Sequence, residues 1–161
     1  CVRAMEAAVK AGNSEGVIAV RNPYSTRPYQ HVLEPLAMYL TIAYKQWSNL
    51  SKSGYYNVGP DDVDCVTTGD LVDLFCKCWN DENDKSFPTA RWENHADPNG
   101  PHEANFLKLD STKIKTMLGY KPRWHIADCM HKTVEFSKAY IEKPETLPNE
   151  MDKEIEEFFR Y

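Results

Sequence analysis

The sequence predicts one mixed α/β domain, residues 1–161, with short strands and several helices. Strand-like runs alternate along the chain with apolar residues at helical spacing, which favours an α/β class. The length of 161 residues suits one domain, and the apolar content of 42% and aromatic content of 12% are typical of a globular protein. No stretch approaches the roughly 20 apolar residues of a membrane span, so we expect no membrane partner.

The chain begins with a predicted amphipathic helix. Val2, Met5 and Val9 lie on one stripe, and Gly12 ends the helix. A chain that starts inside such a helix is expected to be part of a longer protein. The run "GVIAV" that follows predicts a short buried strand.

The next region is predicted to hold a strand, a helix and a strand. "YQHV" is a possible short strand, and "GYYNVG" reads as another, bounded by Gly54 and by Gly59-Pro60. "DDVDC" is expected to be a polar loop. Between the two strands, apolar residues recur at helical spacing at Leu33, Leu36, Ala37, Leu40, Ala43 and Trp47.

A capping-box pattern, Thr67-x-x-Asp70, introduces a further helix. "FPTARW" predicts an edge strand, and "FLKLD" predicts a strand after a turn-rich loop. The predicted apolar face of the helix comprises Leu71, Val72, Leu74, Phe75, Cys78 and Trp79.

Three helices are predicted in the last third of the chain. Either Asp110 or Ser111 caps a short helix that Gly119 terminates. A long helix covers about residues 126–141, and residues 148–161 hold a final acidic helix.

Charge and cysteine content limit the possible partners. The formal net charge of −5 argues against a nucleic-acid partner, which normally requires a broad basic face. The five cysteines are odd in number and irregularly spaced, as in a cytoplasmic protein with reduced thiols. Cys76 and Cys78 are expected to be packing residues. No metal site is predicted, since the pairs His95/His102 and His125/Cys129 lack further ligands.

Cationic and aromatic residues gather in the segment "RNPYSTRPYQHVLEPL" of this acidic chain. Arg21 and Arg27 offer planar donor sets that match phosphate oxygens, and Tyr29 and His31 supply rings. Two prolines pre-set the backbone and reduce the ordering cost of binding. Binding of an anion and the alternative, that both arginines pair with carboxylates elsewhere in the chain, are equally favoured by the sequence.

A second candidate segment is His102-Glu103, which precedes the predicted strand "FLKLD". Such a position commonly carries ligand contacts, although a turn histidine bonded to a nearby backbone group explains the histidine better when it is taken alone. The chain has no glycine-rich phosphate loop, no Tyr-x-x-x-Lys pair and no G-x-S-x-G motif. No catalytic residue is therefore predicted.

Three segments in order resemble the extended short-chain dehydrogenases/reductases that act on nucleotide sugars. They are "STRPYQHVLEP", "YYNVG" and "LDSTKIKTMLGYKPRW". "RNPYSTRPYQHVLEP" and "PHEA" are similar to segments of the CDP-glucose 4,6-dehydratase subgroup. Tyr29 stands where that subgroup usually has tryptophan.

The resemblance implies that this chain is the substrate-binding, C-terminal part of such an enzyme, with the Rossmann half absent. It implies a CDP-sugar or related nucleotide sugar as ligand, with Arg27 on the diphosphate. His102 and Glu103 would form a second substrate segment, and Arg21 and His31 would lie near the ligand. Other sugar-nucleotide dehydratases have an arginine near Asn99, so a second phosphate ligand is left open, with Arg21 as a substitute.

The resemblance also implies that NAD and the catalytic residues of this lyase belong to an N-terminal Rossmann half, so the chain alone binds no NAD and is inactive. We expect the isolated chain to expose apolar surface near Tyr24, Tyr29, Trp92 and Phe106. Another nucleotide-sugar dehydratase, an epimerase or a stand-alone binding module remain alternative readings.

Overall fold

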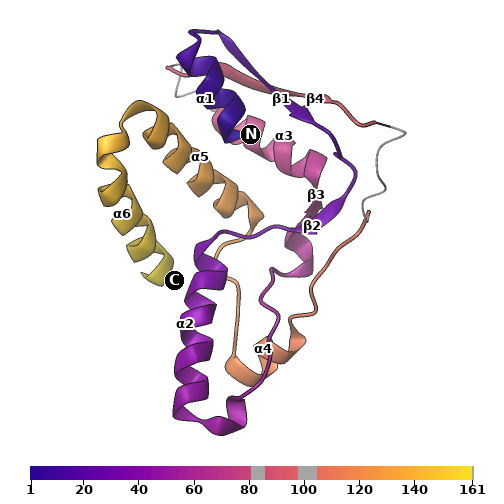
Figure 1. The fold of residues 1–161 in the computed structure, drawn as a ribbon, viewed down its shortest axis with the longest axis vertical. Coiled ribbons are helices and arrows are strands. Elements are labelled where there is room, and N and C mark those ends of the chain that lie inside the picture. Colours follow the sequence, from indigo (N-terminus) through magenta and orange to yellow (C-terminus); the bar gives the residue numbers. More distant parts are fainter. Residues whose placement is uncertain (81–85, 98–104, 161) are drawn as a thin grey trace.

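The body of the molecule is built around two parallel strands. The computed structural model describes residues 1–80, 86–97 and 105–160. Strand β1 (Glu15–Val20) pairs in parallel with β4 (Thr89–Asn94), with Glu15 opposite Thr89 and Val20 opposite Asn94. Helices α1 (Val2–Lys10), α3 (Thr68–Trp79) and α5 (Ile126–Glu142) accompany this pair (Figure 1). The main core comprises Met5, Ile18, Val20, Val72, Phe75, Trp79, Ala90, Met130 and Val134.

Close contact between α1 and β1 depends on a glycine. Alternate residues of β1 are buried, and Gly16 is one of them. A Cβ atom at Gly16 would lie 2.6 Å from Met5 Sδ. Because Met5 is fully buried, the strand can approach the helix only where no side chain intervenes. Gly12 ends α1 with a φ of 67°, as the sequence predicted.

A second, smaller sheet joins the candidate segment to α3. Strand β2 (Thr26–Pro28) pairs antiparallel with β3 (Cys65–Thr67). The predicted capping box at the start of α3 is confirmed, because the Thr67 hydroxyl accepts from Asp70 N and the Asp70 carboxylate accepts from Thr67 N. Cys76 and Cys78 pack against the main core as predicted.

Helix α6 (Leu147–Arg160) runs back along α5 after the short 3-10 turn η3 (Pro144–Thr146) (Figure 1). Its Phe158 is buried with Trp124 and Cys129 in a second apolar cluster. Leu33 and Ala37, near the start of helix α2 (Leu33–Ser48), pack on this cluster. The cluster therefore joins α6, α5 and the beginning of α2.

Helix α2 (Leu33–Ser48) extends away from the body, together with the 3-10 turn η1 (Leu50–Lys52) and the short α4 (Thr112–Leu118) (Figure 1). The predicted helical spacing is confirmed, but most of its apolar side chains lie in solvent. Leu40 is 72% exposed and Trp47 is 90% exposed.

The predicted start and end of α4 are confirmed. Asp110 Oδ1 accepts from Thr112 N at 2.9 Å, which identifies Asp110 as the capping side chain. Ser111 occupies the N-cap position without a side-chain capping bond. Gly119 ends the helix in the left-handed conformation with a φ of 70°.

Three strand predictions are wrong. "GYYNVG" forms no strand, "YQHV" lies after the observed β2, and "FLKLD" has a single bridge, between Phe106 and Thr26. "DDVDC" contains the 3-10 turn η2 (Asp62–Asp64) before β3 begins. A strand needs a pairing partner as well as the right residues, and these segments find no full ladder among the described residues. "FPTARW" is confirmed as β4, shifted by two residues.

The predicted mixed α/β class, with short strands and several helices, is confirmed. In the part of the chain that the structure describes, no helix is both long and apolar enough to cross a membrane.

Candidate functional site

The candidate site lies where the two parallel strands end. Arg21 directly follows β1, and His95 directly follows β4. The His95 backbone N donates to Val20 O at 2.8 Å, and this bond holds the C-terminal ends of β1 and β4 together. In open α/β sheets, ligands commonly bind outside the carboxyl ends of the strands. The segment that carries the candidate residues therefore starts at the favourable edge of the sheet.

The backbone after β1 is fixed by the start of α3. Gly69 N donates to Pro23 O at 2.8 Å, and Thr68 N donates to Ser25 O at 3.0 Å. Pro23 and Ser25 are buried. A Cβ atom at Gly69 would come within 3.2 Å of Pro23 O, so glycine allows this approach. The segment is thus held in one conformation, which lowers the entropy cost of binding a ligand.

The structure brings Arg27 and Tyr29 onto this fixed segment. Arg27 lies in β2 opposite Val66, half-buried, and its Nη1 donates to Thr26 O at 2.9 Å. The Tyr29 hydroxyl lies 2.9 Å from Thr68 Oγ1. Arg21 is exposed at the end of β1. The two guanidinium groups therefore belong to one short segment that starts at the sheet edge, one in solvent and one partly covered.

His31 is held inside the protein. It is 9% exposed, and its Nε2 lies 2.7 Å from Glu154 Oε1 on α6. Its Nδ1 accepts from Leu33 N at 3.3 Å, so in the neutral ring the proton resides on Nε2 and is donated to Glu154. The ring also packs edge-on against Trp124, with 5.0 Å between ring centroids. These contacts anchor the end of the candidate segment to α6.

The second candidate segment, His102-Glu103, lies outside the described residues. The described chain on both sides of it contacts the first segment. Asn94 Nδ2 donates to the Tyr24 hydroxyl at 2.8 Å, and Thr26 N donates to Asn105 O at 2.9 Å. Residues 94 and 105 therefore both adjoin the candidate segment 21–31.

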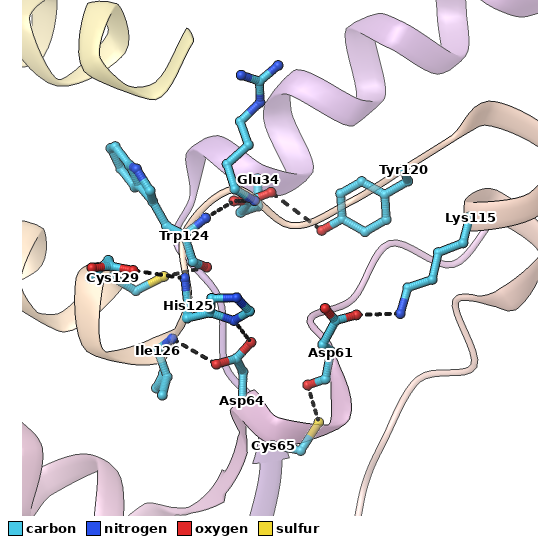
Figure 2. Close-up of polar contacts among 12 residues, drawn as sticks. Glu34, Asp61, Asp64, Cys65, Lys115, Tyr120, Trp124, His125, Ile126 and Cys129 are labelled. Atoms are coloured by element: carbon cyan, nitrogen blue, oxygen red, sulfur yellow. Dashed lines mark hydrogen bonds and ion pairs between the residues drawn. The ribbon is translucent and has the colours of Figure 1, made fainter. Parts of the chain in front are cut away.

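Sequence reasoning missed a buried carboxylate at Glu34. Its Oε1 accepts from Arg123 N at 2.7 Å and from Trp124 N at 2.9 Å, and Glu34 is 2% exposed (Figure 2). The Tyr120 hydroxyl donates to Oε2 at 3.5 Å. Burial, with the charge of Glu34, raises the pKa of Tyr120 and keeps its hydroxyl protonated. An acid in the first turn of an otherwise apolar helix was the available signal.

A second buried carboxylate, Asp64, holds the start of α5. Its oxygens accept from His125 Nδ1 and from Ile126 N, each at 2.9 Å (Figure 2). The hydrogen bond and charge of Asp64 raise the pKa of His125. Glu34 and Asp64 together fix the linker "KPRWH", and their bonds to backbone N–H groups give both of them a structural role.

Three of the described thiols, Cys65, Cys76 and Cys129, are poorly suited to act as nucleophiles. Burial raises the pKa of Cys129 to about 12, and its Sγ donates to Trp124 O at 3.4 Å. Burial also raises the pKa values of Cys65 and Cys76. Because the thiolate is the reactive form, these cysteines are inert near neutral pH. The arrangement at the sheet edge is suited to binding an anion.

A comparison with curated proteins confirms the resemblance seen in the sequence. The chain is 39% identical over 140 residues to a protein named CDP-glucose 4,6-dehydratase from Salmonella typhimurium. The match covers 84% of this chain and 35% of that relative, so the chain spans about a third of the relative's length. No family model matches the chain.

Proposed function

We propose that this chain forms the CDP-glucose-binding portion of an NAD-dependent sugar-nucleotide 4,6-dehydratase, a lyase whose product is a 4-keto-6-deoxy sugar. The observation that carries the proposal is segment 21–31, which bears two arginines on a fixed backbone at the carboxyl ends of β1 and β4. The similarity to a protein named for CDP-glucose supports the choice of ligand.

Arg27 is the proposed ligand of the diphosphate. Its guanidinium is half-buried on β2, where a charge-assisted bond to phosphate is less screened than in open solvent. Arg21 is proposed as a second cation, and the Tyr29 ring as a flat surface beside the ligand. His31 would act indirectly, because its ring is held by Glu154 and fixes the backbone of the segment.

His102 and Glu103 are proposed as further contacts to the substrate. The support is the position of their described neighbours, since Asn94 bonds to Tyr24 and Asn105 bonds to Thr26.

We propose that NAD does not bind at the sheet edge of this chain. Arg21, Asn22 and Pro23 follow β1, where a dinucleotide site needs a glycine-rich turn that leads into a helix. The described glycines with positive φ are Gly12, Gly54 and Gly119, which do not follow either parallel strand. We therefore assign NAD and catalysis to a partner Rossmann half, and the chain alone is proposed to be inactive.

A nucleotide titration tests the binding role. Addition of CDP to the chain should shift amide resonances of segment 21–31, with weaker binding of UDP and GDP. Arg27→Ala removes one charge-assisted bond and should weaken CDP binding by about 10- to 150-fold, equivalent to about 1.5–3 kcal/mol. Arg91→Ala is the matched control, because Arg91 is an exposed arginine on β4 paired with Glu15 and Glu93.

Unchanged CDP affinity in Arg27→Ala would place the anion elsewhere. A preference for UDP or GDP would favour the alternative dehydratases or epimerases. A calorimetric titration with NAD should show no saturable binding, and tight binding would contradict the assignment of NAD to the partner half.

A further inference from the structure

The hydroxyl of Thr68, the first residue of α3, takes part in three hydrogen bonds with segment 21–31. The Tyr29 hydroxyl lies 2.9 Å from Thr68 Oγ1, and the Ser25 hydroxyl lies 3.2 Å from it. Thr68 Oγ1 also donates to Ser25 O at 3.2 Å, beside the backbone bond from Thr68 N to the same carbonyl. One side chain of α3 thus holds the segment at two places, residues 25 and 29.

The chemistry of the hydroxyl group gives each of these bonds a direction. A threonine hydroxyl has one proton to donate and two lone pairs that accept. The backbone carbonyl of Ser25 can only accept, so it receives the Thr68 proton. The hydroxyls of Tyr29 and Ser25 therefore donate to Thr68 Oγ1. Every hydrogen bond that the Thr68 hydroxyl can make is consequently directed at the candidate segment.

Arg27, the proposed ligand of the diphosphate, lies midway between the two held residues. It pairs with Val66 across β2 and β3, and Tyr29 N donates to Arg27 O at 3.1 Å, which couples the positions of Arg27 and Tyr29. Ser25 is 3% exposed and Tyr29 is half-buried, so water competes little for the Thr68 bonds. Bonds formed before the ligand arrives lower the ordering cost of binding. The Thr68 hydroxyl thus restrains the backbone that carries the Arg27 guanidinium.

The bond to α3 gives Tyr29 a different environment from the one that the sequence predicts. Of the four aromatic residues near which exposed apolar surface is predicted, Tyr24 and Phe106 are exposed, at 67% and 64%. Tyr29 and Trp92 are half-buried, and Trp92 Nε1 donates to Asp73 Oδ1 of α3 at 2.7 Å. Tyr29 is therefore a fixed part of the segment, and its position depends on the residue that receives its proton.

We propose that Thr68 is a positioning residue for nucleotide binding. Its hydroxyl holds residues 25 and 29 so that Arg27 meets the diphosphate, and Thr68 itself does not contact the ligand. The inference rests on the proposed function. Tyr29 stands where the resembling subgroup usually has tryptophan, so the bond to Thr68 uses a hydroxyl that tryptophan would not supply.

Calorimetric titration of CDP into matched variants of the chain tests this role. Thr68→Val keeps the shape of the side chain and the backbone bond to Ser25 O but removes the hydroxyl, and should weaken CDP binding by about 3- to 10-fold. Thr68→Ser restores a hydroxyl and should bind CDP within about twofold of the unchanged chain. Thr133→Val is the control, because the Thr133 hydroxyl is also half-buried but donates to Cys129 O within α5.

A double-mutant cycle with Arg27 separates positioning from a general loss of stability. If Thr68 acts through Arg27, Thr68→Val should weaken CDP binding no further once Arg27→Ala is present. A loss of the same size in both backgrounds would overturn the proposal. Hydrogen exchange of amides in residues 25–29 of the ligand-free chain should accelerate in Thr68→Val and stay unchanged in Thr68→Ser.

Tyr29→Phe keeps the test decisive if Thr68→Val does not fold. It keeps the ring and removes the same bond from the other partner. It should weaken CDP binding severalfold in the unchanged chain and leave it as it is in the Arg27→Ala chain.

The positioning role and the nucleotide site fail separately. Weaker CDP binding in Arg27→Ala, with unchanged binding in Thr68→Val and Tyr29→Phe, would refute the positioning role and leave the site in place. Unchanged CDP binding in Arg27→Ala would refute the site, and the positioning role with it.

Discussion

Helices α2 and α3 have the same apolar periodicity and opposite environments. Phe75 and Trp79 of α3 are each 1% exposed, in the main core. Leu40 and Trp47 of α2, which lie seven residues apart and so share a helical face, are 72% and 90% exposed. Figure 1 shows the cause, since α3 lies within the body and α2 extends from it. Periodicity establishes which side chains share a face, and the surroundings decide whether that face is buried.

The difference between the two helices identifies where the stability of this chain resides. Burying a large apolar side chain contributes about 1.5–3 kcal/mol, so α3 contributes to the stability of this chain itself. The exposed apolar face of α2 contributes nothing comparable. Substitutions in the two helices should consequently differ in their effect on stability.

The largest expected effect is at the core of α3. Phe75→Ala should lower the free energy of unfolding by about 3–5 kcal/mol, because it removes a buried ring and leaves a cavity. Trp47→Ala, a large aromatic truncation on α2, should change it by less than about 0.5 kcal/mol. Urea unfolding monitored by circular dichroism measures both. A larger loss in Trp47→Ala than in Phe75→Ala would break the comparison.

The next effect concerns the attached end of α2. Glu34→Ala leaves the buried N–H groups of Arg123 and Trp124 without an acceptor, at about 1–3 kcal/mol each. Glu34→Gln should cost less, because one side-chain oxygen accepts both bonds in the native protein and the amide retains an oxygen. Glu142→Ala, at an exposed glutamate of α5, is the control.

Equal stability of the Glu34→Ala and Glu142→Ala proteins in urea unfolding would show that α2 is held by its apolar first turn alone. A graded series, with Glu34→Ala below Glu34→Gln and both below the control, would identify the carboxylate as the anchor of α2.

Local signals in the sequence predicted much of the fold. The Thr67–Asp70 capping box, the helical period of α3, the extent of α5 and the stop at Gly119 depend on neighbouring residues and were confirmed. The strand predictions that failed depend on partners distant in the sequence. Residues 54–59 have the composition of a strand, but the described chain offers no strand beside them.

The candidate site shows the same division. Arg21, Arg27 and Tyr29 were found from local composition, and the structure fixes their segment at the sheet edge. The acceptor role of Glu34 toward Trp124, 90 residues away, has no local signature. The contact between His31 and Glu154, which joins segment 21–31 to helix α6, has no local signature either.

A smaller effect is expected at this last contact. Glu154→Ala removes the acceptor of His31 Nε2 and should lower the free energy of unfolding by about 1–2 kcal/mol. Hydrogen exchange of amides in residues 29–34 should accelerate, because α6 no longer holds them. Glu156→Ala, an exposed acid on the same helix, is the control. Unchanged exchange in Glu154→Ala would assign the anchoring of this segment to Trp124 packing instead.

The smallest effect is a pH dependence at the start of α5, the helix against which α3 packs. Asp64 raises the pKa of His125 in the folded protein, whereas the unfolded chain has the ordinary value of about 6.5. A raised folded pKa means that the native state binds the proton more tightly. The stabilisation is therefore fully present below pH about 6.5 and is lost as pH rises through the folded pKa. The His125 side chain is 56% exposed, so solvent screening keeps the contribution below about 1 kcal/mol.

Asp64→Asn should lower the midpoint of His125 in an NMR titration and flatten the pH dependence of stability. Glu135→Gln, farther along α5, should leave the His125 midpoint and the pH dependence unchanged. An unmoved midpoint in Asp64→Asn would mean that another group sets the pKa of His125.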